Sequence, residues 1–106
     1  MKKTKTELRK EYDLASRQEV IDRDRSKCVI CYAPAHDVHE IIPRSAFGYD
    51  KSELLFEPKN RVCLCRNHHS LAHNYDMRCK LLKMLKDKYN YNYSETEFQK
   101  YLGEVD

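Results

Sequence analysis

Two cysteines and three histidines lie within the short run from Asn60 to His73, and these residue types bind metal ions and transfer protons. Cys65 and His68 have the x2 spacing that forms half of a tetrahedral zinc site, and Cys28 and Cys31 repeat that spacing upstream. Two such pairs supply the four ligands of one ion. The sequence therefore predicts a structural Zn²⁺ site made of Cys28, Cys31, Cys65 and His68.

The other two histidines of the run predict a second site. A helix over residues 66–74 would place His69 and His73 four positions apart, where their rings lie on one face and can share an ion. One residue turns an α-helix by about 100°, so His68 would point elsewhere, toward Cys65. The neighbours His68 and His69 are therefore expected to serve two different ions.

Composition indicates a small polar domain. The chain has 106 residues, of which 35% are charged, and its mean hydropathy is -0.88, so its core is limited and a structural metal would compensate. No apolar segment of a secretory signal follows Met1, and no apolar run approaches the roughly 20 residues that span a membrane. We therefore expect a cytoplasmic protein with no membrane partner, whose cysteines bind metal instead of forming disulfides. Cys63 and Cys79 are expected to be small buried residues and not ligands.

The charge pattern divides the chain into a basic N-terminal arm or helix, residues 1–15, and a single domain over residues 16–106. The formal net charge is +3 and the pI about 8.6. Lys2, Lys3 and Lys5 begin a basic segment that suits contacts with phosphate groups. Acidic residues alternate with the bases of this segment, so a solvated helix of mixed charge is the alternative.

Hydrophobic periodicity and turn residues predict an α+β fold. Pro43 lacks a backbone donor and should end the first strand. Residues 61–65 alternate between polar and apolar, which predicts a second strand paired antiparallel with the first, and Ser94-Glu95-Thr96-Glu97 is a capping box. In chain order we predict a helix over 6–23 with a break possible near Ser16, a strand over 36–42, a long loop over 44–59, a strand over 61–65, and helices over 66–74, over 76–89 and from 94 to Gly103.

The order of these motifs resembles the HNH family of ββα-metal nucleases. The resemblance covers roughly residues 17 to 75 and rests on the cysteine pair at 28 and 31, the segment Val38-His39-Glu40-Ile41-Ile42-Pro43-Arg44, and the run from Asn60 to His73. It implies a small ββα-metal domain with a structural zinc site, flanked by an N-terminal helix and two C-terminal helices. It also implies a metal-dependent endonuclease that hydrolyses phosphodiester bonds in DNA, of a kind common in phages that act in a bacterial host.

The resemblance assigns roles to individual residues. His39 would be the strand ligand, and His69 with His73 the helix ligands, of a catalytic Mg²⁺, Mn²⁺ or other divalent ion. Asn60 would fix the loop. The family usually has histidine as general base where this chain has Glu40. Glu40 is then the base itself, an extra ligand that leaves the base role to His39, or the mark of a domain that binds nucleic acid without cutting it.

The resemblance implies DNA as the partner, with Arg44 and the N-terminal lysines at 2, 3 and 5 holding phosphate groups. Little sequence preference is expected, because nothing in the chain resembles a module that reads bases. Two other classes of function stay open. One is a non-catalytic nucleic-acid-binding zinc module, and the other is a structural zinc protein that binds a protein partner through residues 81–89.

Overall fold

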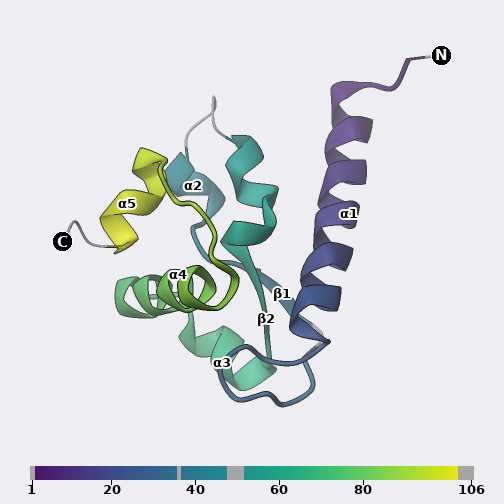
Figure 1. Ribbon diagram of the computed structural model, residues 1–106. Coiled ribbons are helices and arrows are strands. Elements are labelled where there is room, and N and C mark those ends of the chain that lie inside the picture. The colour runs from purple at the N-terminus through teal and green to yellow at the C-terminus, as the bar shows by residue number, and fades with distance from the viewer. Residues whose placement is uncertain (1, 36, 48–51, 103–106) are drawn as a thin grey trace.

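The predicted α+β class is confirmed by the computed structural model, which describes residues 2–35, 37–47 and 52–102 (Figure 1). A two-stranded antiparallel sheet lies between a long N-terminal helix and a group of shorter helices. The elements are α1 (Lys5–Asp24), β1 (Asp37–Glu40), α2 (Arg44–Phe47), 3-10 helices at Ser52–Phe56 and Pro58–Asn60, β2 (Arg61–Leu64), α3 (Arg66–Leu71), α4 (Tyr75–Tyr89) and α5 (Thr96–Leu102).

Helix α1 is continuous and begins at a capping box. The Thr4 hydroxyl accepts a hydrogen bond from the Glu7 amide, and the Glu7 carboxylate accepts one from the Thr4 amide. There is no break at Ser16, whose buried side chain donates a hydrogen bond to the carbonyl of Phe56. The C-terminal half of α1 packs on the sheet, whereas its N-terminal end projects from the body of the molecule (Figure 1).

The strands pair antiparallel as predicted, with Asp37 opposite Leu64 and His39 opposite Val62. Both strands are shorter than the sequence indicated, and His36 lies outside the described residues. The expected alternation of exposure in β2 is wrong, because all four of its residues are buried, Arg61 included. The reason is that α1 covers the face that the polar positions would have exposed, and Arg61 finds its partners there.

The predicted long loop over 44–59 is wrong for the part that the structure describes. It folds into α2 and two 3-10 helices, and Leu55 anchors it in the core with 1% of its surface exposed. Positions 48–51 of this segment, Gly48 among them, lie outside the described residues.

The predicted helix over 66–74 is also shorter in the structure, because α3 ends at Leu71. Asn74 causes this end: its side-chain amide donates to the carbonyl of Leu71, and its side-chain oxygen accepts from the amide of Met77 at the start of α4.

Helix α4 then packs beside α5 on the core, which includes Leu81, Leu85 and Phe98. The predicted stop at Gly103 lies outside the described residues. No helix in the described part of the chain is long and apolar enough to cross a membrane.

Candidate metal centre

Cys28, Cys31, Cys65 and His68 meet at the lower end of the hairpin, and their ligand atoms all lie within 4.8 Å of one another. Zn–S bonds of about 2.3 Å place two tetrahedral sulfurs roughly 3.8 Å apart, and a sulfur and a ring nitrogen roughly 3.6 Å apart. The Cys31 and Cys65 sulfurs are 3.8 Å apart, and the Nδ1 atom of His68 is 3.5 Å from the sulfur of Cys28 and 3.2 Å from that of Cys65. These four side chains can therefore hold one metal ion, as the sequence predicted.

Backbone hydrogen bonds position the first cysteine pair. The amide of Cys28 donates to the carbonyl of Ala33, and the amide of Tyr32 donates to the carbonyl of Cys28, which makes residues 27–34 a tight knuckle. The amide of Val29 donates to the carbonyl of Cys63 and ties the knuckle to β2. Cys65 follows β2 directly and His68 lies on α3, so the hairpin and the helix bring the second pair to the first.

The thiols of this centre are prepared to bind a cation. Burial raises the pKa of Cys28, but hydrogen bonds from the backbone of Cys65, Cys31 and Ile30 outweigh it and lower this pKa to about 6. The backbone of Ala33 lowers the pKa of Cys31, but desolvation and the neighbouring Cys28 and Cys65 thiols raise it more. Deprotonation of Cys28 is thus favoured. Deprotonation of Cys31 beside it is opposed by repulsion between the two thiolates, which a bound divalent cation would remove.

His39, His69 and His73 form a second cluster beside the first centre. Their ring centroids are 4.9 Å apart for His39 and His69, 5.4 Å for His39 and His73, and 5.6 Å for His69 and His73. His73 reaches the cluster from the turn after α3, so it does not share a helical face with His69 as predicted. Among the described residues, only the cysteine–histidine centre brings three or more ligand atoms within 4.8 Å of one another. The three rings are therefore neighbours whose nitrogens do not yet converge.

His39 is the buried member of this cluster, with 6% of its surface exposed, and its Nε2 atom has no hydrogen-bond partner. Burial, with smaller contributions from His69, His73 and Arg78, lowers the pKa of His39 to about 4. Its imidazole is thus neutral at neutral pH, with a lone pair available to a ligand. His69 is oriented by Asp37, whose Oδ2 lies 3.2 Å from its Nδ1, and this leaves Nε2 of His69 for a metal.

An open pocket of about 310 Å³ exposes the cluster, and its lining includes Arg44, Arg78 and Glu40 besides the histidines. Arg44 was predicted from the sequence, whereas Asp37 and Arg78 were not. Asp37 could have been found as the start of the strand that carries His39, two positions later. Arg78 could not, since only the packing of α4 brings it to the pocket.

Glu40 and Asn60 make contacts that fix the pocket. Arg61, with 0% of its side chain exposed, places Nη2 3.1 Å from the Glu40 carboxylate and also pairs with Asp13 of α1. Glu40 is thereby tied to α1, while the next residue along the strand, His39, faces the other histidines. The buried side chain of Asn60 accepts from the amide of Ile42 and donates to the carbonyls of Ile42 and Leu55, which joins the strand end to the following loop.

The N-terminal lysines lie away from both clusters. Lys2, Lys3 and Lys5 are exposed at the beginning of α1, and Lys3 pairs with Glu11 at 2.6 Å. Helix α1 has 20 residues and is about 30 Å long, and the knuckle follows its other end. Any phosphate that these lysines hold is therefore remote from the knuckle and its cysteine pair.

Comparisons of the chain with protein families, with curated proteins and with solved structures gave no match.

Proposed function

We propose that this protein is a metal-dependent endonuclease of the HNH type that hydrolyses phosphodiester bonds in DNA. The cysteine–histidine centre would hold a structural Zn²⁺, because three sulfurs and one imidazole are ligands that zinc prefers. His39, His69 and His73 would hold a catalytic Mg²⁺, Mn²⁺ or other divalent ion. The gathering of these three histidines in an open, cationic pocket is the observation that carries the proposal.

The spacing of the rings suits a shared ion. A ring nitrogen about 2.1 Å from a metal puts the ring centroid roughly 3.3 Å from it, so two imidazoles on one ion have centroids roughly 4.6 to 5.4 Å apart. The three centroid distances of 4.9, 5.4 and 5.6 Å lie in or beside that interval. Small ring rotations would turn the nitrogens toward a common point, and the unpartnered Nε2 of His39 already lacks any competing hydrogen bond.

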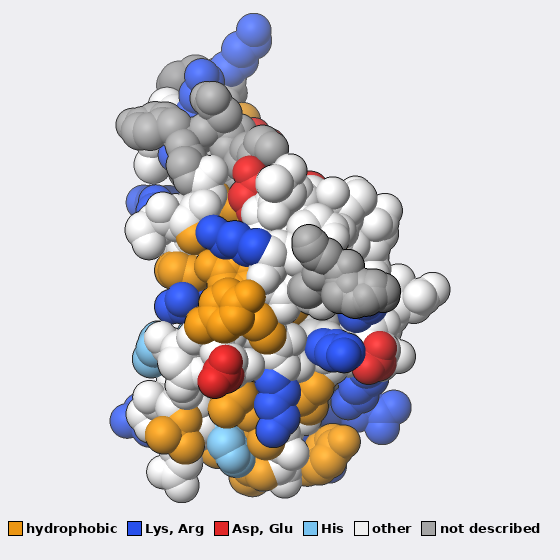
Figure 2. All heavy atoms as spheres, turned by 90° about the vertical axis from the view of Figure 1, so that its left-hand side faces the viewer, with side chains coloured by type: hydrophobic (Ala, Val, Ile, Leu, Met, Phe, Trp, Pro, Cys, Tyr) orange, Lys and Arg blue, Asp and Glu red, His pale blue; other side chains and the backbone are white. Residues whose placement is uncertain are grey.

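The pocket also has the charges that phosphodiester hydrolysis needs. A divalent ion supplies charge neutralisation at the phosphate and lowers the pKa of a bound water. Arg44 and Arg78 line the pocket and can bind the remaining phosphate oxygens. In the reaction, a water oxygen bonds to phosphorus, the bond to the leaving oxygen breaks, and one proton passes to a base while the leaving oxygen gains another. Figure 2 shows a face of the molecule on which histidines lie among Lys and Arg side chains.

Glu40 is the candidate base, since it is among the residues that line the same pocket, although Arg61 holds its carboxylate toward α1 and away from the three histidines. The same ion pair favours a second candidate function, a nucleic-acid-binding zinc module without catalysis. An oxygen that already accepts from a buried guanidinium is a poorer proton acceptor. The two candidates therefore differ in what Glu40 does.

A plasmid-nicking assay with Mg²⁺, Mn²⁺ or Ni²⁺ tests the proposal. The wild-type protein should cleave only with a divalent ion, and His69→Ala should lower the rate by about 10² or more, which is the usual effect of losing a central catalytic group. Glu40→Gln should do the same if Glu40 is the base. Asn67→Ala is the matched control, because Asn67 is exposed on α3 and does not line the pocket.

Binding and folding are measured on the same variants. Equal thermal unfolding of wild type and His69→Ala would show that a lost rate is not lost structure. DNA binding by the wild type with no cleavage under any of the three ions would contradict the nuclease and support the second candidate. If cleavage survives in Glu40→Gln but not in His69→Ala, Glu40 is not the base, and the rest of the proposal stands.

A further inference from the structure

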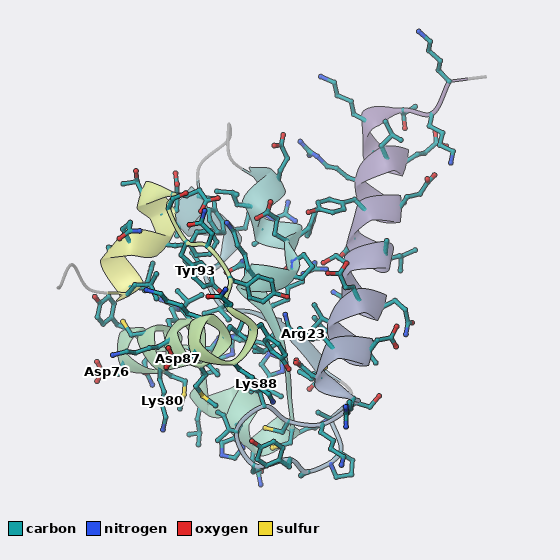
Figure 3. All side chains as sticks on the ribbon, in the orientation of Figure 1. Arg23, Asp76, Lys80, Asp87, Lys88 and Tyr93 are labelled. Carbon is teal, nitrogen blue, oxygen red and sulfur yellow. The ribbon has the colours of Figure 1, made fainter. Side chains whose placement is uncertain are left out.

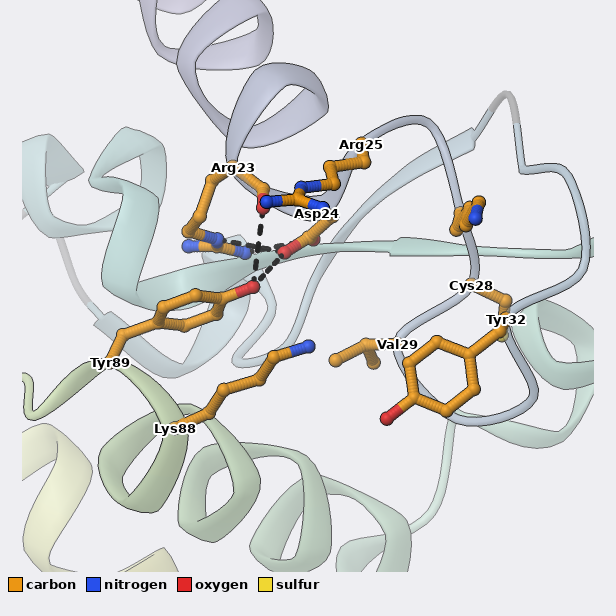
Figure 4. A pocket seen from close by; sticks show the side chains of 9 residues that line it. Arg23, Asp24, Arg25, Cys28, Val29, Tyr32, Lys88 and Tyr89 are labelled. Carbon is orange, nitrogen blue, oxygen red and sulfur yellow. Dashed lines mark hydrogen bonds and ion pairs between the residues drawn. The ribbon is translucent and has the colours of Figure 1, made fainter.

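A second pocket, of about 350 Å³, lies where the C-terminal ends of α1 and α4 meet the knuckle, and we call it the knuckle pocket (Figure 4). Its buried side is formed by Arg23, Asp24, Val29 and Cys28, so it borders the cysteine–histidine centre. Its exposed side chains are Arg25, Lys27, Tyr32 and Lys88. None of these residues lines the pocket of the three histidines, so this is a separate site.

Internal bonds neutralise the buried side of the knuckle pocket. The Arg23 guanidinium pairs with both carboxylate oxygens of Asp24, at 2.9 and 3.0 Å. Asp24 also accepts hydrogen bonds from the Tyr89 hydroxyl and the Cys63 amide, both at 2.9 Å. Figure 4 shows the contacts with Arg23 and Tyr89. Asp24 is therefore fully engaged and is not a counter-ion for the cations on the exposed side.

The exposed side keeps an unbalanced positive charge. Arg25 and Lys27 lie in the turn after α1 and Lys88 lies on α4, and in the described part of the chain no carboxylate forms an ion pair with any of them. Three cations around one concavity attract an anion more strongly than the same charges on a flat surface, because the low-dielectric walls focus their field. The knuckle pocket is thus suited to a phosphate group.

Tyr32 adds an aromatic ring to this pocket, and the ring is not buried against the core. Its side chain is 64% exposed, and its backbone has φ 64°, a left-handed conformation that a residue with a Cβ atom adopts at a cost. Glycine would meet the demand of this turn more easily. The ammonium group of Lys88 lies 5.5 Å from the centre of the Tyr32 ring, so a cation and an exposed ring face the same space.

We propose that the knuckle pocket binds a backbone phosphate of single-stranded nucleic acid and that Tyr32 stacks on an unpaired base beside that phosphate. Cationic grooves with exposed aromatic rings are the common means of binding single strands, since every base offers a π face. The base faces of a duplex are already stacked on each other. This inference rests on the proposed function for the class of substrate, and it adds that the bound substrate contains a single-stranded stretch.

Fluorescence anisotropy with the whole 106-residue chain, loaded with zinc, tests the stacking. The probes are a labelled single-stranded oligodeoxynucleotide and its duplex, without an added divalent ion, so that no cleavage interferes. Tyr32→Gly suits the left-handed turn and removes the whole side chain, ring included. It should weaken single-strand binding about tenfold and leave duplex binding unchanged, whereas Tyr32→Phe should bind as the wild type does.

The salt dependence of binding tests the phosphate contact. The double variant Lys27→Ala/Lys88→Ala should lower the slope of log Kd against log salt concentration by about 0.7, since the knuckle pocket holds one phosphate and each phosphate contact with a single strand contributes about 0.7. Lys80→Ala/Lys83→Ala removes the same charge from exposed positions of α4 outside the knuckle pocket, and it should change the slope less. Figure 3 shows Lys80 and Lys88 at different parts of α4.

Three results would overturn the inference: wild-type affinity in Tyr32→Gly, an equal slope in the two double variants, or wild-type protein that binds the duplex at least as tightly as the single strand. Failure of the proposed function gives a different result. If single-strand binding depends on Tyr32 and Lys88 while no ion supports cleavage, the knuckle pocket stands and the nuclease falls. If cleavage depends on His69 but not on Tyr32 or Lys88, the nuclease stands and the knuckle pocket falls.

Discussion

The two histidine-containing clusters differ in how far the fold has assembled them, although His68 and His69 are adjacent in the chain. In the cysteine–histidine centre, ligand atoms approach to 3.2 Å between Cys65 and His68, and all four lie within 4.8 Å. In the histidine pocket, the ligand atoms of His39, His69 and His73 do not form such a group, and His73 is exposed. One cluster is closed and the other is open.

Under the proposed function, the two clusters would have two different roles. Ligands that the backbone already brings together define a site that holds the fold, since a structural ion needs all its positions filled by protein. Neighbouring rings at an open surface leave positions for water and substrate, as a reactive ion requires. The rotation of about 100° per residue along α3 separates the two sites, because His68 and His69 point in different directions.

The largest expected effect comes from removing a ligand of the closed centre. Cys65→Ser should unfold much of the domain, because zinc binding contributes about 10–16 kcal/mol to folding in small zinc domains and a lost ligand forfeits a large part of it. Circular dichroism during thermal unfolding measures this, with and without a chelator. Cys79→Ser, which changes a cysteine outside the centre, should unfold near the wild-type temperature. An unchanged Tm in Cys65→Ser would contradict a structural role.

A smaller loss of stability is expected at the wall of the open pocket. Arg61→Met should lower the free energy of unfolding by about 3 kcal/mol, because it leaves Asp13 and Glu40 without the buried guanidinium that they share. Glu40→Gln keeps the side-chain shape and should cost about 1 kcal/mol. Urea denaturation of the zinc-loaded protein gives both values. Equal costs would mean that Glu40, and not Asp13, is the main partner of Arg61.

The pH dependence of stability tests the burial of His39 in the open pocket. His39 has a folded-state pKa of about 4, below the usual value of about 6.5 in an unfolded chain, so the unfolded state binds more protons between these values. The contribution of His39 is therefore complete above pH about 6.5 and is lost as the pH falls toward about 4. Relative to His39→Leu, the wild type should lose roughly 2 kcal/mol over that window in urea denaturation without added divalent ion. Parallel curves for the two proteins would show that burial of His39 carries no such penalty.

Much of the closed centre could be predicted from the sequence, because its signal is local. The spacings of Cys28 with Cys31 and of Cys65 with His68 depend only on short turns, and the structure brings all four side chains together. The antiparallel pairing of the strands was predictable for the same reason, from two apolar segments and Pro43.

The open pocket was predicted less well, because its details depend on contacts between distant segments. Asn74 caps both α3 and α4 and so removes His73 from the helix, which the i, i+4 spacing could not indicate. Arg61 reads as a polar strand residue, yet its partners on α1 and β1 make it fully buried. Arg78 reaches the pocket only through the packing of α4. Asn60 was assigned to the loop by the resemblance, and its hydrogen bonds to Ile42 and Leu55 are of the kind that this role requires.

Native mass spectrometry of the wild type, His68→Ala and His69→Ala tests most directly whether adjacent imidazoles serve separate ions. The wild type should retain one tightly bound Zn²⁺, His69→Ala should retain it as well, and His68→Ala should lose it or hold it weakly. When Mn²⁺ is added, the wild type and His68→Ala that remains folded should take up a second ion, and His69→Ala should not. Loss of the tightly bound zinc in His69→Ala, or its full retention in His68→Ala, would contradict the assignment of the two histidines.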